Sequence, residues 1–253
     1  LIAFILYIHM LFRPIRQLAD RFNVLQMGMV ASERVFKVID TNESISNLGK
    51  ISLDNCRGDI EFKNVWFAYN AKDWVLRDVS FKVSAGETLA LVGATGAGKS
   101  SIINLLTRNY EINQGAIYID GVNYLEYDLK SLRKNVSVVL QDVFLFSDSI
   151  YNNIALGRQI DLEKVRAYAK EIEIDDFIKS LPNGYHFNVR ERGGMLSLGQ
   201  RQLISFVRAY LNYPKILILD EATSNIDSES ESLLKRASEK LTNERTSIVI
   251  AHR

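Results

Sequence analysis

Eight residues, GATGAGKS from Gly93 to Ser100, leave little freedom in how the chain around them folds. They fit the pattern G-x-x-x-x-G-K-[ST], with the apolar stretch LALV before them and the helix-like stretch SIINLLTR after them. Glycines let the backbone curl so that N–H groups face phosphate oxygens, the lysine adds positive charge, and the serine hydroxyl can ligate magnesium. The helix that follows adds its positive end. This motif predicts a phosphate cradle made of Gly93, Ala94, Thr95, Gly96, Ala97, Gly98, Lys99, Ser100 and Ser101.

The stretch KILILDE, later in the chain, is a candidate for the second half of a nucleotide site. An apolar strand that ends in two acids is by itself a common junction between a strand and a loop. After a phosphate cradle, however, Asp220 is placed to hold Mg²⁺ through its water shell, as such sites do. Glu221 is placed to deprotonate the attacking water as a general base. The two segments together predict a site that binds ATP with Mg²⁺ and hydrolyses it.

Strand and helix patterns alternate from Asp59 to the end of the chain. Apolar or alternating runs predict strands at residues 60–67, 75–83, 87–93, 136–141, 215–220 and 246–253. Helical periodicity favours helices at residues 100–110, 161–170, 199–212 and 230–241. This alternation is typical of an α/β domain with a largely parallel sheet.

The first 40 residues have a different pattern. Residues 1–12 are apolar but too few to cross a bilayer, which takes about 20 residues. From Leu11 to Ile39 apolar residues recur at steps of three and four, which predicts one long amphipathic helix. The apolar start is either the beginning of a buried helix or the last half of a membrane helix that starts upstream. Three arginines suit the cytoplasmic flank of a membrane span: Arg13, Arg16 and Arg21.

Composition excludes several classes of protein. The formal net charge of +1 gives no overall attraction to nucleic acid. The single cysteine, Cys56, rules out an internal disulfide and suits a reducing compartment. Both ends of the chain are expected to be cut, and the first residue is Leu1 rather than Met.

The stretch LSLGQRQ, residues 196–202, lies just upstream of KILILDE. It resembles the signature motif of the ATP-binding cassette (ABC) family, whose usual form is LSGGQ. Other segments match that family in order and spacing, and VRERGG resembles a loop specific to exporters. The matching positions are Tyr69 before the cradle, Gln141 after VSVVL, Glu191 in VRERGG, Ser224 and Asp227 in SNID, and His252 in VIAHR.

The resemblance is to half-size ABC exporters of the multidrug or lipid type. It implies a P-loop NTPase of ABC type, with a mixed sheet core, an antiparallel β part and a helical subdomain at about 142–205. A long helix from the membrane domain precedes it. The expected organisation is the end of the last transmembrane helix and its cytoplasmic extension at 1–40, a linker at 41–58, and the nucleotide-binding domain at 59–253, truncated at its C-terminal end.

The resemblance also implies roles for single residues. Tyr69 stacks on adenine, and Gln141 senses the terminal phosphate. Glu221, His252 and Gln141 form the catalytic set, and Ser100, Gln141 and Asp220 hold Mg²⁺, partly through water. Glu191 touches the membrane domain, and Ser224 and Asp227 cross a dimer interface. The signature serves the ATP of a partner subunit through Leu196, Ser197, Leu198, Gly199 and Gln200.

Leu198 departs from the family pattern, because the usual residue there is glycine and leucine allows less backbone freedom. The implied partners are a second ABC subunit in a homodimer or heterodimer, the chain's own upstream transmembrane domain, and membrane lipid, with no nucleic acid expected. The implied location is the plasma (inner) membrane, with the nucleotide-binding domain on the cytoplasmic side.

Two alternatives to an exporter motor remain at this point. One is a soluble cassette ATPase that acts on nucleic acid or protein. The other is a regulatory half of a heterodimeric transporter that binds ATP without turning it over. The cargo is open between drugs, lipids and peptides, since the membrane helices that would contact it are almost entirely absent from this sequence.

Overall fold

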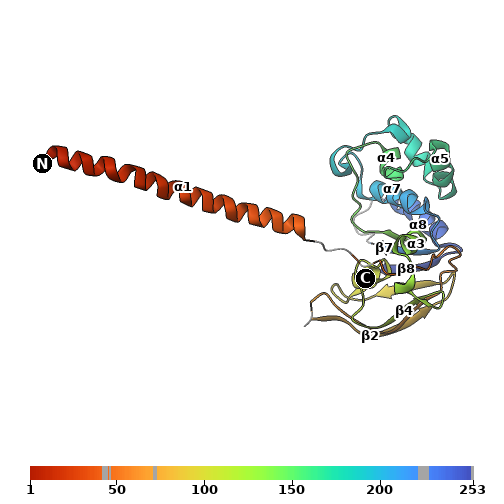
Figure 1. The fold of residues 1–253 in the computed structure, drawn as a ribbon. Coiled ribbons are helices and arrows are strands. Elements are labelled where there is room, and N and C mark those ends of the chain that lie inside the picture. The colour runs from red at the N-terminus through yellow and green to blue at the C-terminus, as the bar shows by residue number, and fades with distance from the viewer. Residues whose placement is uncertain (42–44, 46, 71–72, 222–227, 252–253) are drawn as a thin grey trace. The chain divides into compact units, whose positions relative to one another are not determined.

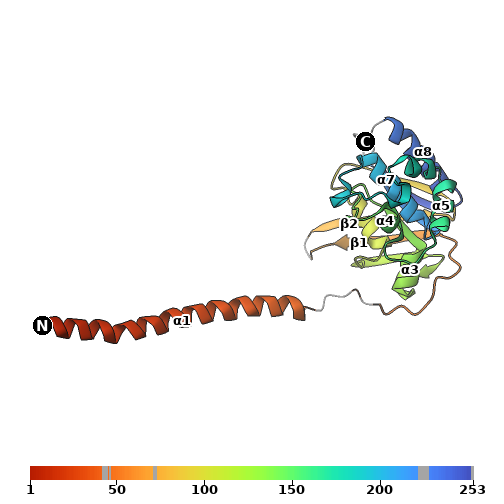
Figure 2. The ribbon, with the colours of Figure 1, turned by 90° about the horizontal axis from the view of Figure 1, so that it is seen from above.

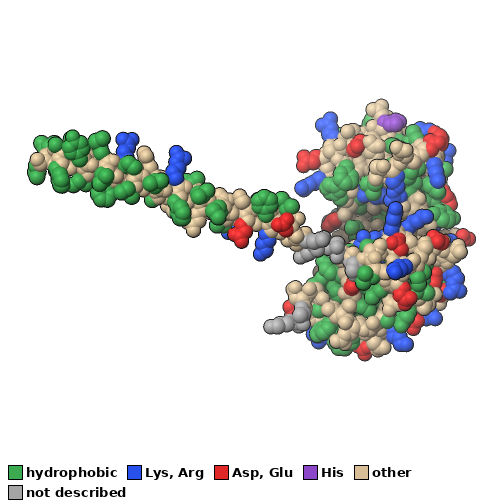
Figure 3. Space-filling view, in the orientation of Figure 1, with side chains coloured by type: hydrophobic (Ala, Val, Ile, Leu, Met, Phe, Trp, Pro, Cys, Tyr) green, Lys and Arg blue, Asp and Glu red, His purple; other side chains and the backbone are tan. Residues whose placement is uncertain are grey.

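The computed structural model describes residues 1–41, 45, 47–70, 73–221 and 228–251. The chain divides into two compact units, Leu1–Ser46 and Asn47–Arg253. The first unit holds one helix, α1 (Ile2–Asp40), which has no buried residue. Hydrophobic side chains cover α1 along its whole length (Figure 3). By length and composition alone, α1 is apolar enough to cross a membrane.

The second unit contains two four-stranded sheets (Figure 1). One is antiparallel, with the order β2-β1-β4-β5, and its strands are β1 (Ile60–Ala68), β2 (Trp74–Val83), β4 (Gln114–Ile119) and β5 (Val122–Asn123). The other is parallel, with the order β3-β8-β7-β6, and its strands are β3 (Thr88–Val92), β6 (Val136–Val139), β7 (Ile216–Glu221) and β8 (Thr246–Ala251). The expected fold class, a mixed sheet core with an antiparallel part and helices, is confirmed.

Short helices connect the strands. The α-helices after the first are α2 (Lys99–Leu106), α3 (Leu129–Asn135), α4 (Ile150–Ala155), α5 (Leu162–Glu171), α6 (Asp175–Ser180), α7 (Leu198–Tyr210) and α8 (Ser228–Thr242). Three single turns of 3₁₀-helix are η1 (Tyr124–Glu126), η2 (Gly184–His186) and η3 (Glu191–Gly193). The helices α4, α5 and α7 gather at one end of this unit, and β2 and β4 lie at the other (Figure 1). Seen from the helical end, α4 and α7 overlap the strands (Figure 2).

The parallel sheet separates two apolar cores. Successive side chains of a strand point to opposite faces, and in β7 both faces are buried. Ile216 and Ile218 join the core that contains the antiparallel sheet and α2, whereas Leu217 and Leu219 join the core of the helical end. A strand buried on both faces is the usual reason for an uninterrupted apolar run such as ILIL.

The helix α2 is fixed by the first core. Four of its side chains are buried together with residues of β1, β4, β7 and β8: Ile102, Ile103, Leu105 and Leu106. Burying aliphatic side chains of this size stabilises the fold by roughly 1.5–3 kcal/mol each. The helix that begins at the GATGAGKS loop therefore has a set position relative to both sheets.

The segment after β6 is held by buried polar contacts. Asn153 of α4 is fully buried, accepts a hydrogen bond from Phe146 N (2.8 Å), and donates to Phe146 O and Ser149 O (3.0 Å each). Arg208 of α7 donates to Asn153 O (2.9 Å) and Phe144 O (3.2 Å). These bonds fasten residues 144–149 to both α4 and α7, although the segment has no regular backbone pairing of its own.

We expect the substitution Asn153→Ala to lower the free energy of unfolding by about 1–3 kcal/mol, because it removes the hydrogen bonds of a fully buried amide to Phe146 and Ser149. Denaturant titration of the chain measures this change. The control is Asn152→Ala on the same helix, whose side chain donates to the exposed Asp148. Equal effects of the two substitutions would contradict a special role for the buried amide.

Candidate functional site

The carboxyl ends of the parallel strands meet at one edge of their sheet. Val92 of β3 and Glu221 of β7 both pair with Ala251 of β8, and Val139 of β6 pairs with Leu219 of β7. The chain that follows each strand therefore starts at nearly the same level. Ligands of open α/β sheets bind outside such edges. The edge brings together the GATGAGKS loop, the acidic end of β7 and the segment that contains Gln141.

The loop between β3 and α2 has the backbone that the motif predicts. Gly96 and Gly98 have φ angles of +85° and +89°. At Gly98 an added Cβ atom would lie 2.7 Å from Leu76 Cδ2, so both the backbone angle and the nearby β2 favour glycine. No side chain caps the amino end of α2. Its first N–H groups therefore point out of the helix at the edge, where they suit an anion.

Lys99 lies against its own loop. Its side chain is only 8% exposed, and its ammonium donates to Gly93 O (2.6 Å) and Ala94 O (3.0 Å). The positive charge is thus already inside the curl of the loop, compensated by two carbonyl dipoles. Phosphate oxygens carry more negative charge than carbonyls and make the stronger bonds to an ammonium. The Lys99 ammonium is therefore placed to exchange its two carbonyl partners for phosphate oxygens when a nucleotide binds.

The other cradle residues are exposed or have separate contacts. Ala94, Thr95, Ala97 and Ser100 are exposed at the loop surface. Ser101 is buried and its hydroxyl lies 3.1 Å from the hydroxyl of Tyr69, which follows β1. The structure therefore brings Tyr69 next to α2. Tyr69 is 45% exposed, so part of its ring is open to a ligand.

Gln141 and Asp220 lie at the same edge. Gln141 is exposed, two residues beyond β6, and Asp220 is half-buried within β7. For Glu221 the structure describes only the backbone, which pairs with Ala251. Ser224, Asp227 and His252 lie outside the described residues. Among the described side chains there is no group of three or more His, Cys, Asp or Glu residues that could hold a metal ion by itself. The oxygens that the described residues do offer, on exposed Ser100 and half-buried Asp220, suit Mg²⁺, which keeps waters and phosphate oxygens as most of its ligands.

The signature segment forms the amino end of α7. Ser197 is its N-cap and makes a capping box: Ser197 Oγ accepts from Gln200 N (3.2 Å), and Gln200 Oε1 accepts from Ser197 N (3.0 Å). Leu196 and Gly199 are buried, which leaves Ser197 exposed at the helix start. Leu198 is the first residue of the helix and has no positive φ. A leucine adopts this backbone without strain, so the fold does not need glycine at that position.

Glu191 lies in an exposed loop that packs against the segment after Gln141. Its neighbours Arg190 and Arg192 have φ angles of +57° and +52°, which are unusual for residues other than glycine. Backbone bonds join the two segments: Val189 N donates to Asp148 O (3.0 Å), and Ile150 N donates to Phe187 O (3.0 Å). The Asp148 carboxylate lies outside this contact, and hydrogen bonds from Asn152 and from the Ser149 backbone lower its pKa, so it stays charged.

Sequence patterns did not single out several residues of this region. Phe144 and Phe146 are each 56% exposed, with their rings edge to face at 5.1 Å. The sequence VFLFSDS carries a signal, since alternating aromatic residues are unusual in a loop. Asn153 and Arg208 carried none, because their partners become visible only in three dimensions.

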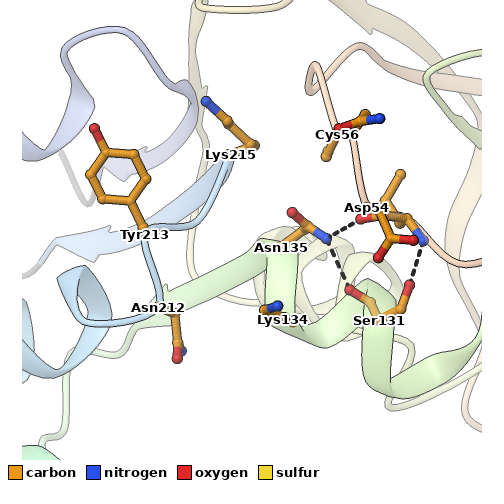
Figure 4. Close-up of a pocket in the computed structure, with 10 residues that line it drawn as sticks. Asp54, Cys56, Ser131, Lys134, Asn135, Asn212, Tyr213 and Lys215 are labelled. Atoms are coloured by element: carbon orange, nitrogen blue, oxygen red, sulfur yellow. Dashed lines mark hydrogen bonds between the residues drawn. The ribbon is translucent and has the colours of Figure 1, made fainter. Parts of the chain in front are cut away.

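A cavity of about 390 Å³ lies away from this edge, at the amino ends of β6 and β7 (Figure 4). There Leu53 N donates to Ser131 Oγ, and Asn135 Nδ2 donates to Leu53 O (2.6 Å each). Burial raises the pKa of the Cys56 thiol in its wall to about 12, so the thiol stays neutral. The cavity is where residues 53–56, within the segment 41–58 expected to be a linker, attach to α3.

Comparisons with known proteins agree with this geometry. The ABC transporter family matches residues 76–224. The chain is 44% identical over 252 residues to the fatty acid ABC transporter ATP-binding/permease protein of Mycobacterium bovis, covering 99% of this chain and 40% of that protein. It is 46% identical over 244 residues to the ATP-dependent lipid A-core flippase of Legionella pneumophila, covering 96% and 41%.

A solved structure of a bacterial Atm1-family ABC exporter with ATP bound also matches, at a TM-score of 0.78 and 37% identity. The match covers 98% of this chain and 44% of that one. The chain spans less than half the length of these relatives. The chain belongs to the ABC transporter family, and over nearly its whole length it is similar to proteins of the ATP-binding/permease type and to an ABC exporter.

Proposed function

We propose that this chain is the ATP-hydrolysing motor of a membrane exporter, which couples ATP-driven closure of a dimer to export of a substrate. The observation that supports this most is the shared edge of the parallel sheet, where the phosphate loop after β3 meets Asp220 and Glu221 at the end of β7. A site for nucleotide phosphates needs positive charge and an acid side by side, and this edge supplies both.

The proposed site divides its work among its residues. The backbone of the loop Gly93–Ser100 and the Lys99 ammonium bind the phosphates, and Tyr69 offers its exposed ring to the adenine. Ser100, Asp220 and Gln141 would hold Mg²⁺, partly through water, and the ion neutralises charge on the terminal phosphates. Glu221 takes a proton from the attacking water. His252 and Gln141 would contact the terminal phosphate.

A second ABC subunit completes the proposed machine. The start of α7, with exposed Ser197 and helical N–H groups, is an anion site of the same kind as the start of α2. We assign it to the ATP of the partner subunit, with Leu196, Leu198, Gly199 and Gln200 forming the rest of the signature. Ser224 and Asp227 are proposed to cross the interface. A single chain carries one complete candidate set, so a homodimer suffices, and a heterodimer is the alternative.

The coupling to the membrane domain is proposed to run through the segment after Gln141. This segment is bonded to α7 through Arg208 and to the loop of Glu191 through Val189 and Phe187. Movement at the terminal phosphate would therefore reach the loop of Glu191 through hydrogen-bonded backbone, and the last turn of α7 through the side chain of Arg208. Phosphate-dependent ordering of such segments is a common form of nucleotide switch.

The apolar helix α1 supports a membrane protein over a soluble cassette ATPase. We propose that it is the end of the chain's own transmembrane domain, in contact with lipid, and that the protein lies in the plasma (inner) membrane with the ATP site in the cytoplasm. The relatives named for fatty acid and for lipid A-core suggest an amphipathic lipid-like substrate, with drugs as the alternative.

The substitution Lys99→Ala is expected to weaken ATP binding by about 10- to 100-fold, the usual range for one lost charged hydrogen bond. Binding is measured by titrating the intact protein, membrane domain included, with ATP and Mg²⁺. Lys63→Ala, an exposed lysine on β1, serves as the control for the loss of one positive charge. Unchanged ATP affinity in Lys99→Ala would remove the loop from the proposed site.

The substitution Glu221→Gln is expected to keep ATP binding but to slow hydrolysis by about 10²- to 10⁴-fold, because only the general base is lost. The measurement is the Mg²⁺-dependent ATPase rate of the intact protein, purified alone in lipid. Glu231→Gln, an exposed acid on α8, is the matched control. Turnover of Glu221→Gln at the parent rate would show that another group acts as base, and no turnover in the parent would point to a required partner half.

A further inference from the structure

Three aromatic rings form a cluster beside the phosphate loop. The ring centroids of Phe67 and Tyr69 are 4.7 Å apart, those of Tyr69 and Tyr110 are 4.9 Å apart, and those of Phe67 and Tyr110 are 5.9 Å apart, all edge to face. Phe67 is buried, whereas Tyr69 and Tyr110 are 45% and 47% exposed. Edge-to-face pairs are favourable and oriented. The buried ring thus supports two exposed ones, and Tyr69 cannot turn without losing two ring contacts.

The hydroxyl of Tyr69 is held as well. It lies 3.1 Å from Ser101 Oγ and accepts a hydrogen bond from Asn104 Nδ2 (3.2 Å). Both partners belong to α2, the helix that starts at Lys99. The Asn104 carbonyl also accepts from the backbone N–H groups of Asn109 and Tyr110, at 2.8 and 3.4 Å. One residue of α2 therefore ties down both the Tyr69 hydroxyl and the turn that carries Tyr110.

This arrangement addresses a geometric requirement of the proposed site. Tyr69 extends from the antiparallel sheet, whereas the loop that binds phosphate follows a strand of the parallel sheet. The ribose of a nucleotide fixes the spacing between base and phosphates, so a stacking ring is useful only at a set distance from the loop. The contacts to α2 set that distance before the ligand arrives, and such preorganisation raises affinity by avoiding the cost of ordering the side chain.

We propose that Asn104 and Tyr110 are positioning residues for the base of the bound nucleotide, and that they act through Tyr69 by holding its ring and hydroxyl against α2. The inference rests on the proposed nucleotide site but goes beyond it, since neither residue belongs to a phosphate-binding motif. If this is correct, substituting either residue lowers the affinity for ligands that carry a base and leaves the affinity for ligands without a base unchanged. If the two residues only support the packing of the fold, the substitutions lower the affinity for both kinds of ligand equally or for neither.

The test compares MgATP with magnesium tripolyphosphate, which has the phosphates but no base. Dissociation constants are measured on the intact protein for Asn104→Ala and Tyr110→Leu. We expect each to weaken ATP binding by about 2- to 10-fold, the range for one hydrogen bond or one ring pair, and to leave tripolyphosphate binding unchanged. In the same variants the KM for ATP should rise by the same factor while kcat stays constant.

Tyr110→Phe is the matched control, because it keeps the ring and should bind ATP as the parent does. A double-mutant cycle tests whether Asn104 acts through the Tyr69 hydroxyl. Tyr69→Phe removes that hydroxyl and keeps the ring, so adding Asn104→Ala to it should cause little further loss. A full additional loss would place the effect of Asn104 elsewhere and overturn its assigned role.

The outcomes separate this inference from the proposed function. Equal weakening of ATP and tripolyphosphate, or no weakening of either, in Asn104→Ala and Tyr110→Leu overturns the inference. If Lys99→Ala still loses ATP in the same assay, the nucleotide site itself stands. If the parent binds no ATP, both fail together. Tripolyphosphate binding in each variant also shows that the loop is still folded.

Discussion

The register of the parallel sheet is the constraint on which the candidate site depends. Val92 and Glu221 are level because both pair with Ala251, so the phosphate loop and the acidic strand end start from one edge. Packing on both faces of β7 favours this register, because each face fits a different core. A slip by one residue would move Ile216 and Ile218 into the helical core and Leu217 and Leu219 into the other, which exchanges every side chain of the strand between the cores. It would also turn Asp220 to the opposite face. Packing of apolar side chains far from the edge thus decides where the acids lie.

The same logic applies to the two helices that begin at anion-binding turns. Both α2 and α7 are short helices with heavily buried bodies, and nine of the thirteen residues of α7 are buried. Each has an exposed serine at its amino end, Ser100 in α2 and the N-cap Ser197 in α7. Isolated helices of this length are marginal in water, so tertiary packing maintains them. The helix ends can therefore keep polar backbone groups for a ligand. At α7 the capping box already satisfies one of these N–H groups, that of Gln200, whereas no side chain caps α2. The difference suits an α2 that binds phosphate more closely.

Much of this could be predicted from the sequence, because the rules involved are local. The strand, loop and helix around Gly93–Ser100 follow from glycine and lysine at fixed spacing, and the strand before Asp220 follows from its unbroken apolar run. The ends of elements were less predictable. The helix expected at 100–110 ends at Leu106, because Arg108 has a φ of +51° and its buried guanidinium donates to Tyr127 O. The caution raised by Leu198 does not apply to its backbone, because that residue lies within a helix and not in a turn that needs glycine.

What the sequence left hidden is the set of contacts between segments far apart in the chain. The bonds of Asn104 to Tyr69 and of Arg208 to Phe144 join residues that share no local pattern. They have a common effect, since each attaches a segment without regular pairing to a buried helix that begins at a proposed anion site. Tyr69 is attached to α2 and the segment after Gln141 to α7. The helix α2 thus connects the phosphate loop with Tyr69, and α7 connects the signature segment with the exposed pair Phe144 and Phe146. Exposed aromatic residues on a firmly held segment are typical of a contact surface, which agrees with the proposed coupling of this segment to the membrane domain.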